Sequence, residues 1–237
     1  MAGLSLDLHI FKTYLGNVFN VFFVTHEFLG KIAFISYLIL SDIISLTLVI
    51  LLCSDTKKFR KFLLSFFIAG YIGLIFWYCI PATSPRGYID VGVTHIDTSH
   101  LVQYKATPAP VATQYIDITD KIWIDPSGIE TNVSTFPSMH ATWAILVLCS
   151  LVSLIPLLSV VLIPWYIALC IGAIAIYQHF GVDMIAGAIL GLIIFISVGK
   201  LLDFEDRYFE DRYSLLYIWN IFEEDTKKLF AMFKKLT

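Results

Sequence analysis

Long runs of apolar residues that few polar positions interrupt dominate the chain. A transmembrane helix needs about 20 apolar residues, because each residue adds about 1.5 Å and the hydrocarbon layer of a bilayer is about 30 Å thick. Six runs meet this requirement, so the sequence predicts an all-α integral membrane protein, a bundle of six transmembrane helices. Their ranges are Leu8–Leu29, Ile32–Cys53, Phe62–Ile80, Met139–Ile155, Leu157–Gln178 and Val182–Leu202.

The first of these runs is the least apolar. The polar residues that interrupt it are Lys12, Asn17, Asn20, His26 and Glu27. It is therefore either a span or a helix that lies at the membrane interface. It lacks the basic leader and the small-residue cleavage site of a signal peptide. Further along, Pro156 is predicted to mark the turn between the fourth and fifth runs.

The composition excludes several classes of protein. Of the 237 residues, 58% are hydrophobic and 15% are charged, and the mean hydropathy is +0.79. This composition is not that of a soluble, disordered or small secreted domain. The 16 basic and 19 acidic residues nearly balance, so we expect no nucleic-acid partner. Four cysteines without metal-like spacing are predicted to be buried thiols: Cys53, Cys79, Cys149 and Cys170.

The basic residues of the short loop 54–61 predict the orientation in the membrane. This loop carries four basic residues and one acid, and short basic loops face the cytoplasm. With six spans, both termini are then cytoplasmic, and the long segment Pro81–Pro137 lies on the exoplasmic face together with the junction at His179. The predicted regions are a two-span N-terminal region 1–61, a catalytic core 62–202 that includes the exoplasmic loop 81–137, and an amphipathic cytoplasmic tail 203–237.

Polar residues open the fourth run in the sequence Pro137-Ser138-Met139-His140. Free backbone amides at a helix start attract anions such as phosphate, and proline suits the first helical turn. His140 would lie in that turn, where it can exchange a proton with a bound ligand. The motif therefore indicates a phosphate site, although a histidine at a membrane interface can also be a simple headgroup contact.

A second polar motif, His179-Phe180-Gly181-Val182-Asp183, lies at the exoplasmic junction of the last two runs. If this turn is helical, His179 and Asp183 share a face. The carboxylate can then hold one ring nitrogen while the other presents its lone pair to an electrophile. The alternative is a buried ion pair that locks two helices together.

A third motif, Pro81-Ala82-Thr83-Ser84-Pro85-Arg86, follows the third run directly. Its prolines stiffen the backbone beside the membrane. Arg86 is thereby expected at the level of His140 and His179, where its fork of donors matches phosphate oxygens. The alternative is an interfacial arginine that reaches for lipid headgroups.

The three motifs together resemble those of the type 2 phosphatidic acid phosphatase superfamily, over roughly residues 62–202. The resemblance implies that His179 is the nucleophile that forms a phosphohistidine, that Asp183 orients it, and that His140 is the general acid. It also implies that Arg86 and the amides near Ser138 hold the phosphoryl oxygens. The proline-rich box at residues 81–86 is similar to that of the branch that includes inositol phosphorylceramide synthases.

The sequence departs from the phosphatase branch at two places. That branch usually has Ser-Arg where this chain has Gly172 and Ala173, and glycine where it has Met139. Both departures favour the phosphotransferase branch. Three residues are candidates to replace the missing phosphate-binding donor: Lys105, Lys121 and Gln178.

The sequence thus predicts a membrane lipid phosphotransferase or phosphatase with its site on the exoplasmic face. The alternatives are a generic lipid phosphate or pyrophosphate phosphatase, and a non-catalytic lipid-binding or transport protein on the same fold. We expect no metal or other cofactor, because arginine and backbone amides can balance the phosphate charge and no carboxylate cluster has metal-site spacing. The expected partners are a lipid substrate and the membrane.

Overall fold

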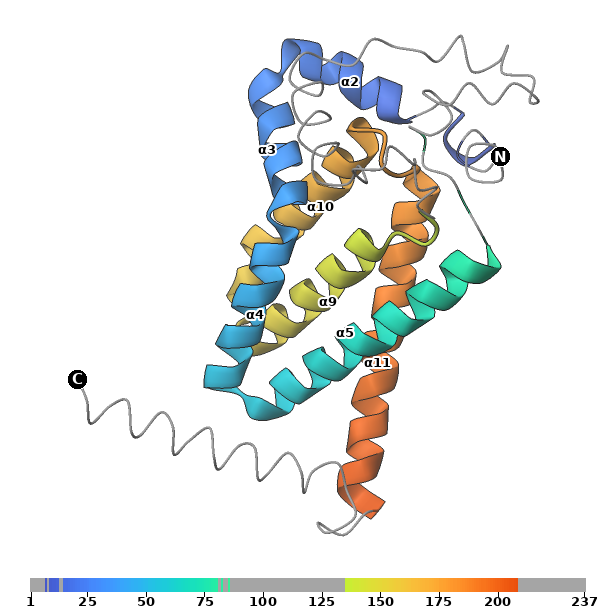
Figure 1. Cartoon of the computed structure of the whole chain (residues 1–237). Helices are drawn as coiled ribbons and strands as arrows, with labels where there is room; N and C mark the ends of the chain where they lie inside the picture. The colour runs from blue at the N-terminus through green and yellow to red at the C-terminus, as the bar shows by residue number, and fades with distance from the viewer. Residues whose placement is uncertain are drawn as a thin grey trace, which may run out of the picture.

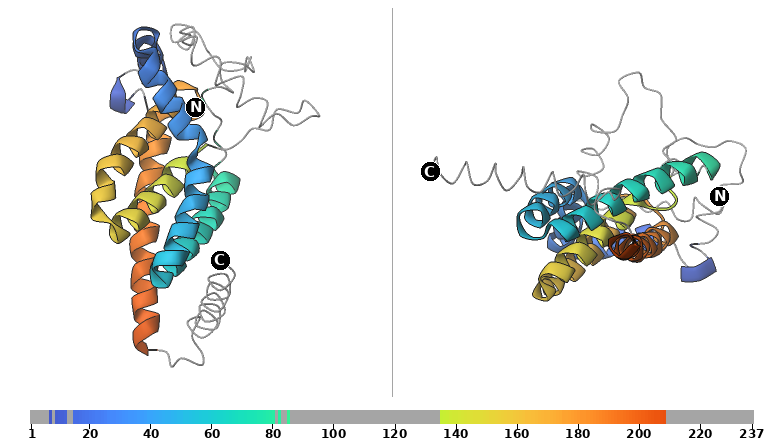
Figure 2. Two further views of the ribbon diagram at one scale, coloured as in Figure 1. Left: turned by 90° about the vertical axis from the view of Figure 1, so that its left-hand side faces the viewer. Right: turned by 90° about the horizontal axis from the view of Figure 1, so that it is seen from below.

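The computed structural model describes residues 7, 9–12, 15–80, 82, 85 and 135–208. Within these ranges the regular structure is helical, which confirms the all-α class. The elements are α2 (Leu15–Thr25), α3 (Glu27–Leu38), α4 (Leu40–Ser54), α5 (Thr56–Cys79), α9 (Met139–Leu154), the short 3₁₀ helix η1 (Pro156–Leu158), α10 (Ser159–Ala175) and α11 (Gly181–Tyr208). The helix α11 runs steeply through the bundle and extends furthest, whereas α5 crosses it obliquely (Figures 1 and 2).

Fewer helices qualify as membrane spans than the sequence predicts. Among the described residues three are long and apolar enough, namely α5, α11 and the continuous stretch Pro156–Ala175. A fourth span results if α3 and α4, which are bent by 56° at their junction, cross the membrane together. The apolar helix α9 has 16 residues and falls short of that length. The prediction of six spans is therefore not confirmed.

The first predicted span is not a single helix. The helix α2 has only 11 residues, equivalent to about 16 Å, and cannot cross the hydrocarbon layer. A new helix, α3, begins at Glu27, directly after His26. In Figure 1, α2 lies at one end of the bundle and runs in a different direction from α3. The structure thus agrees with the interfacial alternative for this run.

The second predicted span is broken at Ile39, which ends α3 and precedes α4. The break places Asp42 in the first turn of α4, where an acid interacts favourably with the helix dipole. Asp42 is exposed on the surface of the bundle. The prediction of four buried thiols was wrong for Cys53 and Cys79, which are also exposed, whereas Cys149 and Cys170 are half-buried.

The remaining helix boundaries follow from local chemistry. Asp55 is the N-cap of α5, and its carboxylate accepts a hydrogen bond of 3.0 Å from the Lys58 amide. The basic loop residues therefore belong to the first turns of α5, which begins before the predicted span. The turn at Pro156 is confirmed, because α9 ends at Leu154 and η1 begins at this proline.

Small residues allow α9 and α11 to pack closely. A Cβ atom on Gly187 would collide with the Ser138 carbonyl oxygen, and one on Gly191 would lie 2.9 Å from the Thr142 carbonyl oxygen. The Thr142 hydroxyl lies 2.9 Å from the Gly187 carbonyl oxygen and bonds the two helices directly. Close approach through small residues is typical of helices packed in membranes.

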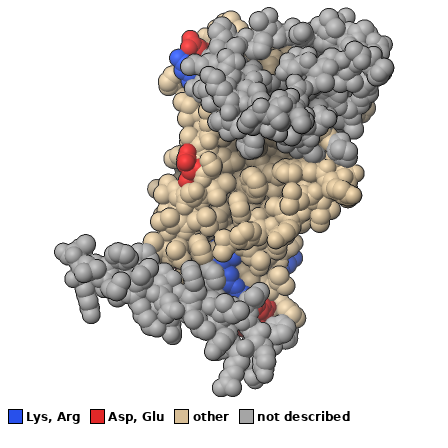
Figure 3. Space-filling view, viewed as in Figure 1, with Lys and Arg blue, Asp and Glu red and all other residues tan. Residues whose placement is uncertain are grey.

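Ion pairs join α5 to α11 at the end of the bundle where α11 terminates. Arg60 pairs with Glu205, and Lys57 lies 3.9 Å from Asp206. Both acids belong to the first copy of a repeated Phe-Glu-Asp-Arg-Tyr sequence, which forms the end of α11. The second copy and the rest of the predicted tail, residues 209–237, lie outside the described residues. Figure 3 shows few charged side chains on the middle of the described surface, as expected for a membrane-embedded band.

Candidate functional site

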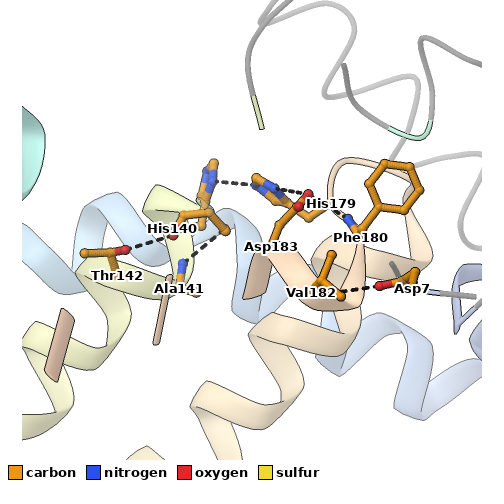
Figure 4. A network of polar contacts seen from close by, with 9 residues as sticks. Asp7, His140, Ala141, Thr142, His179, Phe180, Val182 and Asp183 are labelled. Atoms are coloured by element: carbon orange, nitrogen blue, oxygen red, sulfur yellow. Dashed lines mark hydrogen bonds and ion pairs between the residues drawn. The ribbon is translucent and has the colours of Figure 1, made fainter. Parts of the chain in front are cut away.

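Two histidines meet at the end of the bundle opposite these ion pairs. His140 is the second residue of α9, and His179 lies in the turn between α10 and α11. The distance between His179 Nε2 and His140 Nδ1 is 3.3 Å, and the ring planes are inclined by 65° (Figure 4). The two sequence motifs therefore converge, as their shared position at one face predicted.

The turn that carries His179 is held by backbone hydrogen bonds to the end of α10. The amides of Gln178 and His179 both donate to the Ala173 carbonyl oxygen, at 3.1 and 3.4 Å. Tyr177 adopts a left-handed backbone with φ of 61°, which is uncommon for a residue other than glycine. Its hydroxyl lies 3.2 Å from Asn17 Oδ1 in α2. The Gln178 side chain is half-buried beside His179.

Asp183 lies behind His179 on the side away from His140. The distance from Asp183 Oδ2 to His179 Nδ1 is 3.7 Å, which is an ion-pair distance but too long for a hydrogen bond. The same oxygen accepts a hydrogen bond of 2.9 Å from the Phe180 amide. We expected a shared helical face, but His179 precedes the first residue of α11. The carboxylate instead faces the imidazole across the helix start.

Ser138 connects the two motifs. Its hydroxyl accepts a hydrogen bond of 3.3 Å from the Ala141 amide and so caps α9. Its amide donates to the Asp183 carbonyl oxygen at 3.0 Å, and the residue is fully buried. Pro137 precedes this cap and lies outside the first helical turn in which the sequence placed it. The next two amides, those of Met139 and His140, lie where the helix itself offers no acceptor.

Aromatic side chains surround His140. The ring of Tyr37, from α3, lies 4.6 Å from the imidazole centroid, and the ring of Trp143 lies 6.5 Å away. Trp143 in turn stacks on Phe66 of α5 at 5.3 Å. Tyr37 was missed by the sequence analysis because it lies in a predominantly apolar run and belongs to no recognisable motif.

Asp7 is a second residue that the sequence analysis missed. Its side chain is fully buried, and Oδ1 accepts a hydrogen bond of 2.9 Å from the Val182 amide (Figure 4). Burial raises the pKa of the Asp7 carboxyl and the negative charge of Asp183 adds to this rise, whereas hydrogen bonds from Val182 and Gly181 lower it. No spacing pattern links positions 7 and 182, so nothing in the sequence indicated this contact.

Three of the predicted phosphate ligands, Arg86, Lys105 and Lys121, lie outside the described residues. All three belong to the predicted exoplasmic loop 81–137. A hydrogen bond joins residues near the two ends of this loop, because the Thr135 amide donates to the Ala82 carbonyl oxygen at 3.0 Å. In the part of the chain that the structure describes, no three His, Cys, Asp or Glu side chains are grouped as metal ligands.

Two adjacent imidazoles with a carboxylate behind one of them are suited to nucleophilic and acid–base chemistry. A carboxylate beside Nδ1 favours the tautomer that has its proton there and its lone pair on Nε2. Nε2 is the atom that faces His140. The second imidazole lies within reach of any group that reacts at this nitrogen, so it can donate or accept a proton.

The apolar helices bring two histidines and a carboxylate together at one end of the bundle. These features are those of an integral membrane protein with a histidine-based site. The family model described as the PAP2 superfamily matches residues 9–197, and the chain belongs to this superfamily. Membership indicates a function of the lipid phosphatase or phosphotransferase type. The comparisons with curated proteins and with solved structures found no match.

Proposed function

We propose that this protein transfers or removes a phosphoryl or phosphate-headgroup unit of a lipid through a phosphohistidine intermediate. The observation that carries this proposal is the contact of 3.3 Å between His179 Nε2 and His140 Nδ1, with Asp183 on the opposite side of the His179 ring. A nucleophile, its orienting group and an acid–base partner are the three parts that such a reaction needs.

In the first step, the lone pair of His179 Nε2 attacks phosphorus and the bond between phosphorus and the leaving oxygen breaks. His140 gives its proton to this oxygen. In the second step, water or a lipid hydroxyl attacks the phosphohistidine while His140 takes the proton of the attacking group. The phosphorus–nitrogen bond then breaks, and both histidines return to their initial states.

The closeness of the two rings has a consequence for substrate binding. A separation of 3.3 Å between the nitrogens is a direct contact and leaves no room for a phosphate group between them. Binding must therefore move the rings apart. Geometry in a ligand-free site commonly becomes productive only in the substrate complex.

The phosphoryl oxygens need donors, and we assign this role to the amides after Ser138 together with Arg86. The bond between Thr135 and Ala82 supports this assignment, because it keeps the start of the Arg86 segment near the start of α9. Lys105, Lys121 and Gln178 are further candidates.

The packing around position 172 supports the branch related to inositol phosphorylceramide synthases. Gly172 lies against the Ala33 carbonyl oxygen so closely that any side chain would collide, and Ala173 is fully buried. A phosphate-binding Ser-Arg pair would not fit here without a different packing of α3 and α10. A phosphate-binding cation must then come from another part of the chain. The candidate is Arg86, at the end of the proline-rich box that is similar to that of this branch.

We place the site on the exoplasmic face, because the basic residues of loop 54–61 lie at the opposite end of the bundle. The contact between Asp7 and Val182 lies at the site end of the bundle. We therefore propose an exoplasmic N-terminal segment, in place of the cytoplasmic N-terminus that six spans predict, and a cytoplasmic end of α11.

The experiment is a phosphate-tracing assay on the full chain in lipid nanodiscs, with lipids labelled at phosphate and a panel of alcohol acceptors. Label in free phosphate identifies a phosphatase, and label on an acceptor identifies a phosphotransferase. In either case His179→Ala should abolish turnover, and His140→Ala should lower it by about 10²–10⁴-fold. Binding of labelled lipid should persist in both variants.

Lipid binding without any label transfer would contradict the proposal and would support a binding or transport protein. Turnover that survives in His179→Ala would exclude a phosphohistidine at this residue.

A further inference from the structure

The start of α11 is stabilised by two carboxylates, one from its own first turn and one from a distant part of the chain. The amides of a first helical turn have no acceptor in their own helix, and a side-chain oxygen at the N-cap usually accepts one of them. Phe180 precedes α11 and has no such oxygen. Asp183 accepts a hydrogen bond from the Phe180 amide, and Asp7 accepts one from the Val182 amide.

The environment of Asp7 shows that this contact is built into the fold. The side chain has no exposed surface, and its second oxygen, Oδ2, is buried without a hydrogen-bond partner. Burial of a polar oxygen without a partner costs free energy, so the position is costly for the folded state. In the described part of the chain, the hydrogen bond from the Val182 amide to Oδ1 offsets part of this cost.

Apolar contacts hold the N-terminal segment against the same turn. A Cβ atom on Gly181 would lie 2.9 Å from a ring carbon of Phe11 and 2.8 Å from a methyl carbon of Leu15. It would also lie 3.3 Å from Asp7 Oδ1. The absence of a side chain at Gly181 thus lets the segment approach the helix start closely.

We propose that Asp7 is a positioning residue that caps α11 from a distance and thereby fixes the turn carrying His179 and Asp183. The residue that it holds, Val182, is the immediate neighbour of Asp183 and lies three residues after His179. A shift of this turn moves both groups relative to His140. The catalytic part of the inference rests on the proposed function, whereas the capping contact does not.

The test compares two substitutions of Asp7. Asp7→Ala removes the cap, whereas Asp7→Asn keeps an oxygen that can accept the Val182 amide. In the phosphate-tracing assay, kcat per folded molecule should fall by about 10- to 100-fold in Asp7→Ala, with KM changed by less than about 3-fold. Asp7→Asn should recover most of this loss. Hydrogen exchange of the Val182 amide should accelerate in Asp7→Ala and not in Asp7→Asn.

Asp55→Ala is the matched control, because it removes the carboxylate cap of α5 at the opposite end of the bundle. It should leave kcat close to that of the unsubstituted protein. Gly181→Ala is a second variant, which pushes Phe11 and Leu15 away while every polar side chain is kept. It should lower kcat as Asp7→Ala does.

Two results would overturn the inference. Unchanged exchange of the Val182 amide in Asp7→Ala would show that Asp7 does not cap α11, even if the protein transferred no phosphate at all. Faster exchange with unchanged kcat would show a cap without a positioning role. If the unsubstituted protein transfers no label, the proposed function fails, and the exchange experiment still decides whether the cap exists.

Discussion

At the scale of single residues, the two histidines have different neighbours, which suit them to different roles in the proposed reaction. Asp183 faces Nδ1 of His179, so in the proposed reaction the attacking nitrogen is Nε2, which faces His140. Tyr37 covers a face of the His140 ring and limits the positions that this ring can take. A mobile imidazole would lose proton-transfer efficiency, because general acid catalysis needs a fixed geometry.

This contact predicts that Tyr37→Ala lowers kcat by about tenfold, because His140 loses the ring that supports it. Tyr37→Phe keeps the ring and should retain most of the activity. Steady-state kinetics in nanodiscs measure both effects. The control is Tyr71→Ala, because Tyr71 is a tyrosine of α5 that is 69% exposed. Equal activity of Tyr37→Ala and the unsubstituted protein would mean that His140 is held by other contacts.

At the scale of elements, the packing of α9 against α11 sets the distance between the motifs. Ser138 precedes α9 and bonds to Asp183 in the first turn of α11, and Thr142 bonds to Gly187 one turn further along. These contacts require the helices to be close, which Gly187 and Gly191 permit because they have no side chains. The same interface thus supports both the fold and the site.

A methyl group at Gly187 should therefore damage both stability and activity. We expect Gly187→Ala to destabilise the protein by about 1–3 kcal/mol, as is usual for overpacking, because the new Cβ would collide with the Ser138 carbonyl oxygen. Thermal unfolding in detergent and kcat in nanodiscs should both decrease. Gly70→Ala is the control, because a Cβ there would have open space around it. A fully active and stable Gly187→Ala would show that α9 and α11 can separate without cost.

At the scale of the whole molecule, the bundle has two chemically different ends. The histidines and Asp7 lie at one end, and the ion pairs of Arg60 and Lys57 with the end of α11 lie at the other. The helix α11 joins the two ends with 28 residues, equivalent to about 42 Å. This length exceeds the hydrocarbon layer, so the two ends can lie on opposite sides of the membrane.

Two exposed cysteines allow a direct test of this orientation. Cys79 is the last residue of α5 at the site end, and Cys53 lies near the end of α4 at the opposite end. In variants that retain only one cysteine, a membrane-impermeant maleimide should label Cys79 in intact cells and Cys53 only after permeabilisation. The reverse pattern would place the site on the cytoplasmic face.

The sequence by itself determined the helical class and the two motifs. Continuous apolar runs must form helices in a bilayer, because each backbone amide and carbonyl needs a hydrogen-bond partner within its own segment. The bounds of α9 and the turn at Pro156 followed from local signals and agree with the prediction to within one residue. The contact between His140 and His179 also followed, since both motifs were predicted at the same face.

Only the tertiary structure decided which distant residues complete the site and which runs can span the membrane. Asp7 and Tyr37 lie in residues 1–61, outside the predicted catalytic core, yet they contact Val182 and His140. The break at Ile39 was equally hidden, because apolar composition does not reveal where a helix bends. A hydrophobic pattern depends only on residues that are close together in the sequence, whereas contacts between distant residues depend on how the helices pack.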